Sequence, residues 1–314
     1  MVFGSRSMKI LTFGQTGQLA RALKRTQPNT VELIQLSHQQ VDITQPQRIN
    51  EALAYYRPNI IINCAAYTNV EKAEINPESA IKTNALAVEY IAKAASAYGI
   101  KLIQLSTDYV FDGGSSTPYL VTQKPAAINT YGQSKLLAEA TLLSYQSDLF
   151  CIVRTSWLYH HTGNNFLTTM LKLMSQTHNQ AAIGSSKENP INIVNDQTGS
   201  PTMVDDLARF LWKLCLQKQW SAIYHWSDAG ICTWYEFAQA IKTQAIGLGL
   251  LRQPIYLQPI TSEQYASIVN RPVFSALDSG LSHTIATQNP WQQQLSLCLN
   301  ELKQSKECLF VAKN

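Results

Sequence analysis

Short apolar runs rich in β-branched residues alternate with longer segments of helical period along the first half of the chain. The runs predict strands at Ile10–Phe13, Val31–Leu36, Ile60–Asn63, Lys101–Ser106 and Phe150–Arg154. The segments between them predict helices at Gly17–Thr26, Pro46–Arg57, Pro77–Tyr98 and Tyr131–Tyr145. Strands that alternate with helices pair in parallel through right-handed crossovers. The pattern therefore predicts an α/β fold with a doubly wound parallel sheet.

The alternation loosens after Arg154. Further helices are predicted at Phe166–Met174, Met203–Gln217, Thr233–Thr243 and Trp291–Lys303, with loops between them. We expect a larger domain over residues 1–158, in which residues 1–7 form a tail ahead of a second start at Met8. Residues 159–314 are expected to form mainly a smaller C-terminal lobe, with 191–225 returning to the large sheet.

Composition narrows the classes of protein. The 314 residues are 45% hydrophobic and 15% charged, which gives enough chain for a buried core and excludes the signature of disorder. A net charge of +4 without a basic cluster gives no reason to expect nucleic-acid binding. No apolar run approaches the ~20 residues of a membrane span, and no secretory h-region opens the chain. Six cysteines without a C-x-x-C pair predict buried free thiols, no metal and a cytoplasmic protein.

A glycine turn follows the first predicted strand. Gly14, Gly17 and Ala20 are spaced G-x-x-G-x-x-A, just before a helix. Small residues let a backbone approach a dinucleotide pyrophosphate, which the free N–H groups of a helix start attract. Such turns also occur without a ligand, but this position in an α/β pattern favours a Rossmann-type nucleotide site. The second strand is followed by Ser37 instead of an acidic residue, so NADPH is permitted and NADH stays open.

A tyrosine and a lysine share one face of a predicted helix. Tyr131 and Lys135 are four residues apart, and Thr107 stands at the end of the preceding strand. Hydride reduction of a carbonyl needs a proton donor, and we expect Lys135 to lower the pKa of Tyr131 for that role. A surface Tyr–Lys pair is the plainer alternative. Because ligands bind at the carboxyl ends of parallel strands, Thr107 favours the catalytic interpretation.

These blocks, taken in order, resemble those of the extended short-chain dehydrogenase/reductases. Four further blocks narrow the resemblance to the dTDP-4-dehydrorhamnose reductase family, from Met8 to about Lys303: Asn63–Thr68, Arg154–Tyr159, Asn195–Thr202 and Arg271–Asp278. The resemblance implies reduction of the C4 ketone of dTDP-4-dehydro-6-deoxy-L-mannose to dTDP-L-rhamnose. It implies NADPH as the cofactor, with NADH also plausible.

The resemblance also implies roles for individual residues. The cofactor would contact the first turn, the end of the second strand and the loop after the third, at Gly14, Gly17, Gln18, Leu19, Ser37, Asp42, Ile43, Ala66, Tyr67 and Thr68. Tyr131 would donate the proton, and Lys135 would bind the nicotinamide ribose. Thr107 would orient the substrate carbonyl, and Asp108 and Trp157 would border the sugar. Asn84 would bond either the backbone or the ribose side of the cofactor.

Three features depart from the family or stand outside it. Some members dimerise through a metal held by glutamates, one of them in the first helix, where this chain has Arg21 between two alanines. We therefore do not expect a metal-bridged dimer. His160 and His161 are predicted on a loop surface, pointing to opposite sides of an extended chain. The long segment 179–193 is expected to be a surface insertion or an added edge of the substrate cleft.

Two other functions fit parts of the pattern. A sugar-nucleotide epimerase or dehydratase of the same fold is one, although the dehydratase-like proteins have a Glu after the strand-end Thr-Asp, where this chain has Tyr109. A non-catalytic subunit resembling the regulatory subunit of methionine adenosyltransferase is the other. It would be expected to have a degenerate site, whereas Thr107, Tyr131 and Lys135 are all present.

Overall fold

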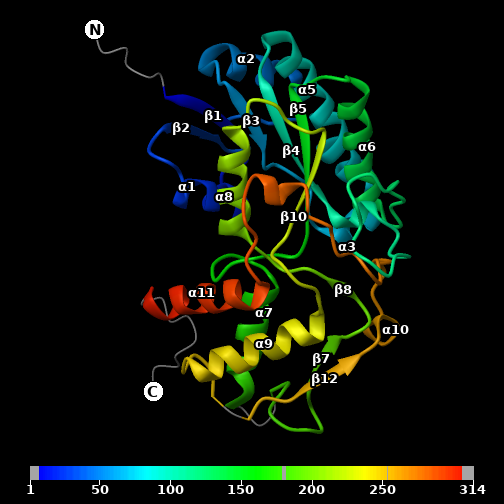
Figure 1. Cartoon of the computed structure of the whole chain (residues 1–314). Coiled ribbons are helices and arrows are strands. Elements are labelled where there is room, and N and C mark those ends of the chain that lie inside the picture. Colours follow the sequence, from blue (N-terminus) through cyan, green and yellow to red (C-terminus); the bar gives the residue numbers. More distant parts are fainter. Residues whose placement is uncertain (1–6, 179–181, 253, 306–314) are drawn as a thin grey trace.

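The computed structural model describes residues 7–178, 182–252 and 254–305. The predicted tail is therefore described only at Ser7, and residues 179–181 of the long segment lie outside the described residues. Figure 1 shows a larger α/β unit and a smaller lobe below it. Within the described ranges, no helix combines the length and apolarity that a bilayer crossing requires.

The larger unit is built on a six-stranded parallel sheet. Its order is β10-β5-β4-β3-β1-β2. The strands are β1 (Met8–Phe13), β2 (Val31–Leu36), β3 (Ile60–Asn63), β4 (Lys101–Thr107), β5 (Phe150–Thr155) and β10 (Ile223–Trp226). The direction of strand addition reverses at β1, between β2 and β3. In parallel α/β sheets, ligands bind beyond the carboxyl ends of the strands at such a reversal.

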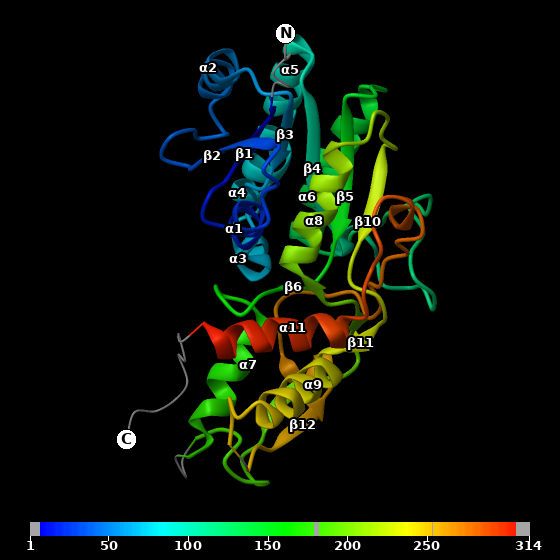
Figure 2. The same ribbon diagram turned by 60° about the vertical axis from the view of Figure 1, so that its left-hand side comes forward.

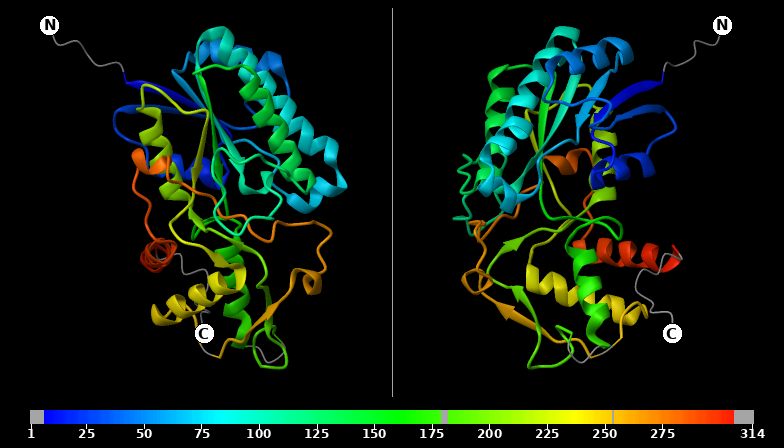
Figure 3. Two further views of the ribbon diagram at one scale, coloured as in Figure 1. Left: turned by 45° about the vertical axis from the view of Figure 1, so that its right-hand side comes forward. Right: turned by 180° about the vertical axis from the view of Figure 1, so that it is seen from behind.

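Helices cover both faces of the sheet (Figure 3). On one face, α1 (Gln18–Arg25) and α8 (Val204–Cys215) pack on Ile60 and Ile62; on the other, α2 (Pro46–Tyr56), α5 (Ala87–Tyr98) and α6 (Thr130–Ser144) pack with Ile61. Successive side chains of a strand point to opposite faces, so a continuous isoleucine run serves both cores. The predicted doubly wound α/β fold is confirmed.

The smaller lobe packs three helices on short strands. These are α7 (Phe166–Ser175), α9 (Trp234–Gly247) and α11 (Trp291–Gln304), and α11 lies between α9 and the larger unit (Figure 2). The strands β7 (Ile191–Val194) and β12 (Leu257–Ile260) pair in parallel, beside α10 (Ser262–Tyr265). Two short pairs lie at the junction: β6 (Leu158–Tyr159) with β9 (Thr202–Met203), and β8 (Thr198–Gly199) with β11 (Cys232–Thr233).

Two elements differ from the sequence prediction. The predicted helix over residues 77–98 is divided into α4 (Pro77–Ile81), a π-helical turn η1 (Lys82–Leu86) and α5, and a short α3 (Val70–Ile75) precedes it. The segment 191–225 divides between the lobes, because β7 pairs with β12, whereas α8 packs on the large sheet and β10 extends it. Single 3₁₀ turns complete the described chain: η2 (Asp108–Val110), η3 (Gln176–His178) and η4 (Ser282–Thr284).

Candidate active site

A cavity of about 580 Å³ opens at the carboxyl end of the large sheet. It is lined by the first turn of α1, the ends of β3 to β5, the start of α6 and the chain after β5. Ten of the predicted site residues lie together in this lining: Gly17, Gln18, Leu19, Ala66, Thr68, Thr107, Asp108, Tyr131, Lys135 and Trp157. The fold thus brings residues from distant parts of the sequence to one cleft.

Five predicted cofactor residues are not part of that lining: Gly14, Ser37, Asp42, Ile43 and Tyr67. Ser37 follows β2, and both its N–H and its hydroxyl donate to the Gln40 side chain, at 2.9 and 3.0 Å. Asp42 accepts a hydrogen bond from the backbone N–H of Thr44 at 2.9 Å, and the side chain of Ile43 packs in the core. Their contacts with a cofactor stay predictions.

The first turn has the features of an anion site. Gly14 has φ +93°, and a Cβ there would approach Ala65 N to 3.1 Å, so the position requires glycine. Gly17 caps α1 without a side-chain hydrogen bond, and the first turn of α1 has no acidic residue. The first N–H groups of α1 therefore have no capping side chain to occupy them, and with the helix dipole they favour a phosphate. These residues fit a dinucleotide.

Local contacts position α6 in the cleft. Its cap is Asn129, whose side chain accepts from Gly132 N at 2.8 Å. A Cβ on Gly132 would lie 2.1 Å from Tyr109 O, so glycine allows the first turn of α6 to pack against η2, the 3₁₀ turn that follows β4. Buried Asn84 donates to Ser134 on α6 at 3.0 Å and exchanges hydrogen bonds with the backbone of Tyr67. Asn84 thus joins the loop after β3 to α6, the backbone role among its two predicted alternatives.

Burial sets the protonation of the Tyr–Lys pair. It raises the pKa of Tyr131 to about 12; nearby Asp108 adds to this shift and a hydrogen bond with Thr107 opposes it. The phenol is therefore protonated at neutral pH, as a proton donor must be. The pKa of Tyr131 is thus raised and not lowered as expected, and Lys135 is not among the causes of this shift. Burial also lowers the pKa of Lys135 to about 8, against the opposing charge of Glu139, so its ammonium is mostly charged at pH 7.

Two hydroxyls surround a buried carboxyl at the end of β4. Thr107 donates to Asp108 Oδ1 at 2.9 Å, and Ser275 hydrogen-bonds the same side chain. Burial raises the pKa of Asp108 to about 6 despite these bonds. Ser275 belongs to a loop from the end of the chain, which is also held by the bond from Asn129 to the carbonyl of Asn270 at 2.9 Å. This loop thus contacts the carboxyl end of β4 and the start of α6.

A buried charge network, not predicted from the sequence, lies one helical turn beyond Lys135 on α6. Glu139 accepts from Arg154 at 2.6 Å and from Ser106 at 2.5 Å. Arg154 Nη1 also lies 3.2 Å from His225 Nε2. Ser106 is therefore a hydrogen-bonded hydroxyl near the end of β4. A glutamate one helical turn beyond Lys135 is the only signal that the sequence offered.

A second cavity, of about 350 Å³, lies in the smaller lobe. Its lining includes Phe166, Gln197, Trp234 and Arg271. Trp234 stacks on Trp157 of the first cavity, with ring centroids 3.4 Å apart. Trp234 therefore borders a cavity of the smaller lobe as well as stacking on Trp157.

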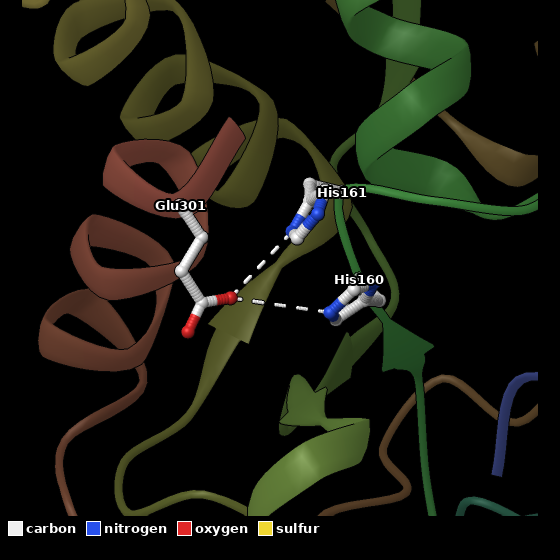
Figure 4. Close-up of side chains that lie close together, drawn as sticks. All are labelled: His160, His161 and Glu301. Carbon is white, nitrogen blue, oxygen red and sulfur yellow. Dashed lines mark ion pairs between the residues drawn. The ribbon is translucent and has the colours of Figure 1, made fainter. Parts of the chain in front are cut away.

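His160 and His161 do not point to opposite sides, which corrects the sequence prediction. Their ring centroids are 4.0 Å apart and His160 is only 2% exposed, because the chain turns after β6 instead of staying extended. Figure 4 shows both rings directed to Glu301 on α11, and the three potential ligand atoms lie within 4.8 Å of one another.

Among the described residues, His160, His161 and Glu301 form a group whose geometry could hold a metal ion. The backbone N–H of Thr162 donates to His160 Nδ1 at 3.1 Å, which leaves the proton of the neutral ring on Nε2, the atom that faces Glu301. Burial, His161 and Arg25 lower the pKa of His160 to about 4. The guanidinium of Arg25 adds positive charge near this cluster, and the absence of a metal stays a prediction.

The glycine turn, the helix start and the Tyr–Lys pair at one end of a doubly wound sheet define an extended short-chain dehydrogenase/reductase. Residues 8–304 match the family described as the RmlD substrate binding domain. The chain is 35% identical to the dTDP-4-dehydrorhamnose reductase of Escherichia coli (strain K12), over 94% of this chain and 98% of that protein. The chain belongs to the dTDP-4-dehydrorhamnose reductase family, a family of oxidoreductases.

Two solved structures of dTDP-4-dehydrorhamnose reductases have the same fold as this chain. A dTDP-4-dehydrorhamnose reductase from Clostridium acetobutylicum superposes with a TM-score of 0.84 at 33% identity, covering 94% of this chain and all (100%) of that one. The enzyme from Bacillus anthracis, solved in complex with NADP, gives a TM-score of 0.83 at 33% identity, over 94% and 99% of the two chains. The family and the class of enzyme predicted from the sequence are confirmed.

Proposed function

We propose that this chain reduces the C4 ketone of dTDP-4-dehydrorhamnose to give dTDP-L-rhamnose. The observation that carries the proposal is the position of Tyr131, whose phenol is hydrogen-bonded to Thr107 in the same cleft as the anion site of α1. The Escherichia coli relative is named for this reaction, and the Bacillus anthracis relative binds NADP. NADPH, when bound, supplies the hydride; NADH is the second candidate.

The cofactor would be held along one side of the cleft. Gly17, Gln18 and Leu19 would bind the pyrophosphate with the N–H groups of α1, and Gly14 would allow its close approach. Lys135 would donate to the nicotinamide ribose. The remaining contacts would come from the loop after β3 (Ala66, Tyr67 and Thr68) and from the end of β2 (Ser37, Asp42 and Ile43).

The protein's own chemistry in this proposal is a proton transfer. Tyr131 gives its phenolic proton to the oxygen that becomes the C4 hydroxyl, while Thr107 fixes that oxygen by a hydrogen bond. The charge of Lys135 stabilises the tyrosinate that remains. Water then restores the proton to Tyr131 after the product leaves. Holding the reacting atoms in contact supplies a large part of the acceleration.

The sugar nucleotide would extend into the smaller lobe. Asp108 and Trp157 would border the sugar next to Tyr131. The second cavity offers the aromatic faces of Phe166 and Trp234 to a base, and the Arg271 guanidinium to a diphosphate. A flat base and a diphosphate are the two parts of the substrate that this chemistry recognises.

We also propose a domain boundary near residue 158 and a cytoplasmic location. Cys64, Cys151, Cys215, Cys232 and Cys298 are free thiols, which supports a reducing compartment. A metal-bridged dimer is not part of the proposal, because Arg21 on α1 offers no carboxylate.

The reaction is tested by mixing the purified chain with NADPH and dTDP-4-dehydrorhamnose. We expect one NADPH to be consumed, as measured by its absorbance, for each dTDP-L-rhamnose formed. The product is identified by NMR. The same chain with dTDP-4-dehydro-6-deoxy-D-glucose, the D-sugar isomer, is the control. NADPH consumption with neither sugar would contradict the proposal.

A further inference from the structure

Trp157 has a backbone conformation that bulky residues seldom adopt. Its φ is +45°, in the left-handed region. Neighbouring bonds maintain this conformation: Thr202 N donates to the Trp157 carbonyl at 3.2 Å, and the Ser156 hydroxyl donates to Ser200 O at 2.7 Å. Such conformations persist only where the surrounding structure holds them, and they gather at ligand sites. The backbone conformation at Trp157 therefore fixes the direction of its indole side chain.

That indole stacks on a second one. The rings of Trp157 and Trp234 are 7° from parallel, with centroids 3.4 Å apart. Trp234 is the first residue of α9, whose start is fixed by a capping box between Thr233 and Glu236. Trp157 lines the cavity that holds Tyr131, and Trp234 lines the cavity of the smaller lobe. The stacked pair is thus the wall that the two cavities share.

Gly199 makes room for this pair. A Cβ at Gly199 would lie 2.7 to 2.8 Å from Cε2, Cζ2 and Nε1 of Trp157. The backbone φ of Gly199 is not in the left-handed region, so its conformation does not require glycine and only the space does. The backbone cannot move aside easily, because Gly199 pairs with Cys232 and Thr198 N donates to Val273 O at 2.7 Å.

We propose that Gly199 is a positioning residue for the sugar nucleotide. By having no side chain, it lets the Trp157 indole lie against Trp234, and the pair forms the surface along which the substrate passes from the catalytic cleft to the smaller lobe. An added methyl group displaces the indole, since the stack leaves it no space on the side of Trp234. The inference rests on the proposed function for its substrate, but the stack can be tested without turnover.

The first test is Gly199→Ala. We expect the KM for dTDP-4-dehydrorhamnose to rise by about tenfold or more, as for a misfit of one methyl group, with kcat and the Kd of NADPH within about twofold. The near-ultraviolet circular dichroism of the coupled indoles should fall as well. The control is Gly247→Ala, the same change on α9 with nothing within 4 Å of the new Cβ. It should match the wild type in every readout.

A double mutant distinguishes an effect of Gly199→Ala on the Trp157 indole from an effect on the backbone. Trp157→Leu removes the three atoms that the new Cβ would meet, so adding Gly199→Ala to it should change KM no further. An equal effect of Gly199→Ala in both backgrounds would overturn the proposal, as would an unchanged dichroism in Gly199→Ala. If Gly199→Ala does not fold, Trp234→Leu breaks the stack without crowding and should raise KM in the same way; an unaltered KM there would also contradict it.

The two proposals fail in different ways. A wild-type chain that consumes no NADPH with this sugar would contradict the proposed function. The dichroism of Gly199→Ala would still report whether Gly199 holds the indole pair.

Discussion

Glu139 and Arg154 form a two-pronged ion pair in the interior of the larger unit. Arg154 Nη2 lies 2.6 Å from Glu139 Oε2 and Nε lies 2.9 Å from Oε1, and both side chains are 1% exposed. Glu139 lies one helical turn beyond Lys135 on α6, and Arg154 is on β5. The pair therefore joins α6, the helix that carries Tyr131 and Lys135, to β5 of the sheet.

Breaking this pair should destabilise the fold. Glu139→Gln leaves the Arg154 guanidinium without a counter-charge in the interior, and we expect a loss of about 3–5 kcal/mol in the free energy of unfolding. Urea denaturation followed by circular dichroism measures it. Glu51→Gln, in the exposed pair with Arg48, is the control and should cost less than about 1 kcal/mol. Equal losses in the two variants would show that the Glu139–Arg154 pair contributes no more to the free energy of unfolding than an exposed ion pair does.

The charge of Lys135 should limit activity at alkaline pH. Its folded pKa of about 8 means that the ammonium is lost as the pH rises through that value, so kcat/KM for NADPH should fall there. Lys135→Met should lower both cofactor affinity and rate at pH 7, and should flatten this alkaline limb. Lys135→Arg keeps the charge and is the matched comparison. An unchanged Kd for NADPH in Lys135→Met would disprove the role in ribose binding.

His225 should make the protein sensitive to acid. Burial and Arg154 lower the pKa of His225 to about 3, whereas an unfolded histidine titrates near 6.5. The unfolded state therefore gains a proton first as the pH falls below about 6.5, and stability declines down to about pH 3. His225→Gln, which cannot titrate, should reduce the slope of the unfolding free energy between pH 6.5 and 4. A slope identical to that of the wild type would assign the acid sensitivity to other groups.

The choice of cofactor should respond to Ser37. This residue follows β2, where an acidic side chain in related folds accepts from the adenosine ribose. Ser37→Asp should weaken NADPH by about one to a few kcal/mol through repulsion of its 2′-phosphate, with a smaller effect on NADH. Steady-state kinetics with both cofactors measures the difference, and Ser37→Asn controls for size. Equal effects on NADPH and NADH would place Ser37 away from the 2′ position.

The sheet and the Tyr–Lys pair follow from local sequence. β-Branched runs such as Ile60-Ile61-Ile62 can be buried on both faces only in a covered parallel sheet, and Tyr131 and Lys135 share a face on any α-helix. Family blocks added the cleft residues. The break at Asn84 was not predicted, since apolar residues keep helical spacing in the sequence from Ala80 to Ala95 and give no sign of the extra residue in a π-turn.

The remaining features depend on contacts between distant segments. Glu139 and Arg154 lie on different elements, and no spacing in the sequence predicts that they meet. The directions of His160 and His161 were wrong because the chain turns directly after β6. The predicted direction of the pKa shift of Tyr131 was wrong, because burial of the phenol exists only in the folded chain and the charge of Asp108 adds to it.

The most direct test of the central claim is the turnover of Tyr131→Phe with NADPH and dTDP-4-dehydrorhamnose, beside the Kd of NADPH for the same variant. Phenylalanine keeps the ring and removes only the proton that the reaction needs. We predict that kcat falls by about 10²–10⁴-fold while the Kd changes by no more than about twofold. Turnover near that of the wild type would contradict the assignment of Tyr131 as the proton donor.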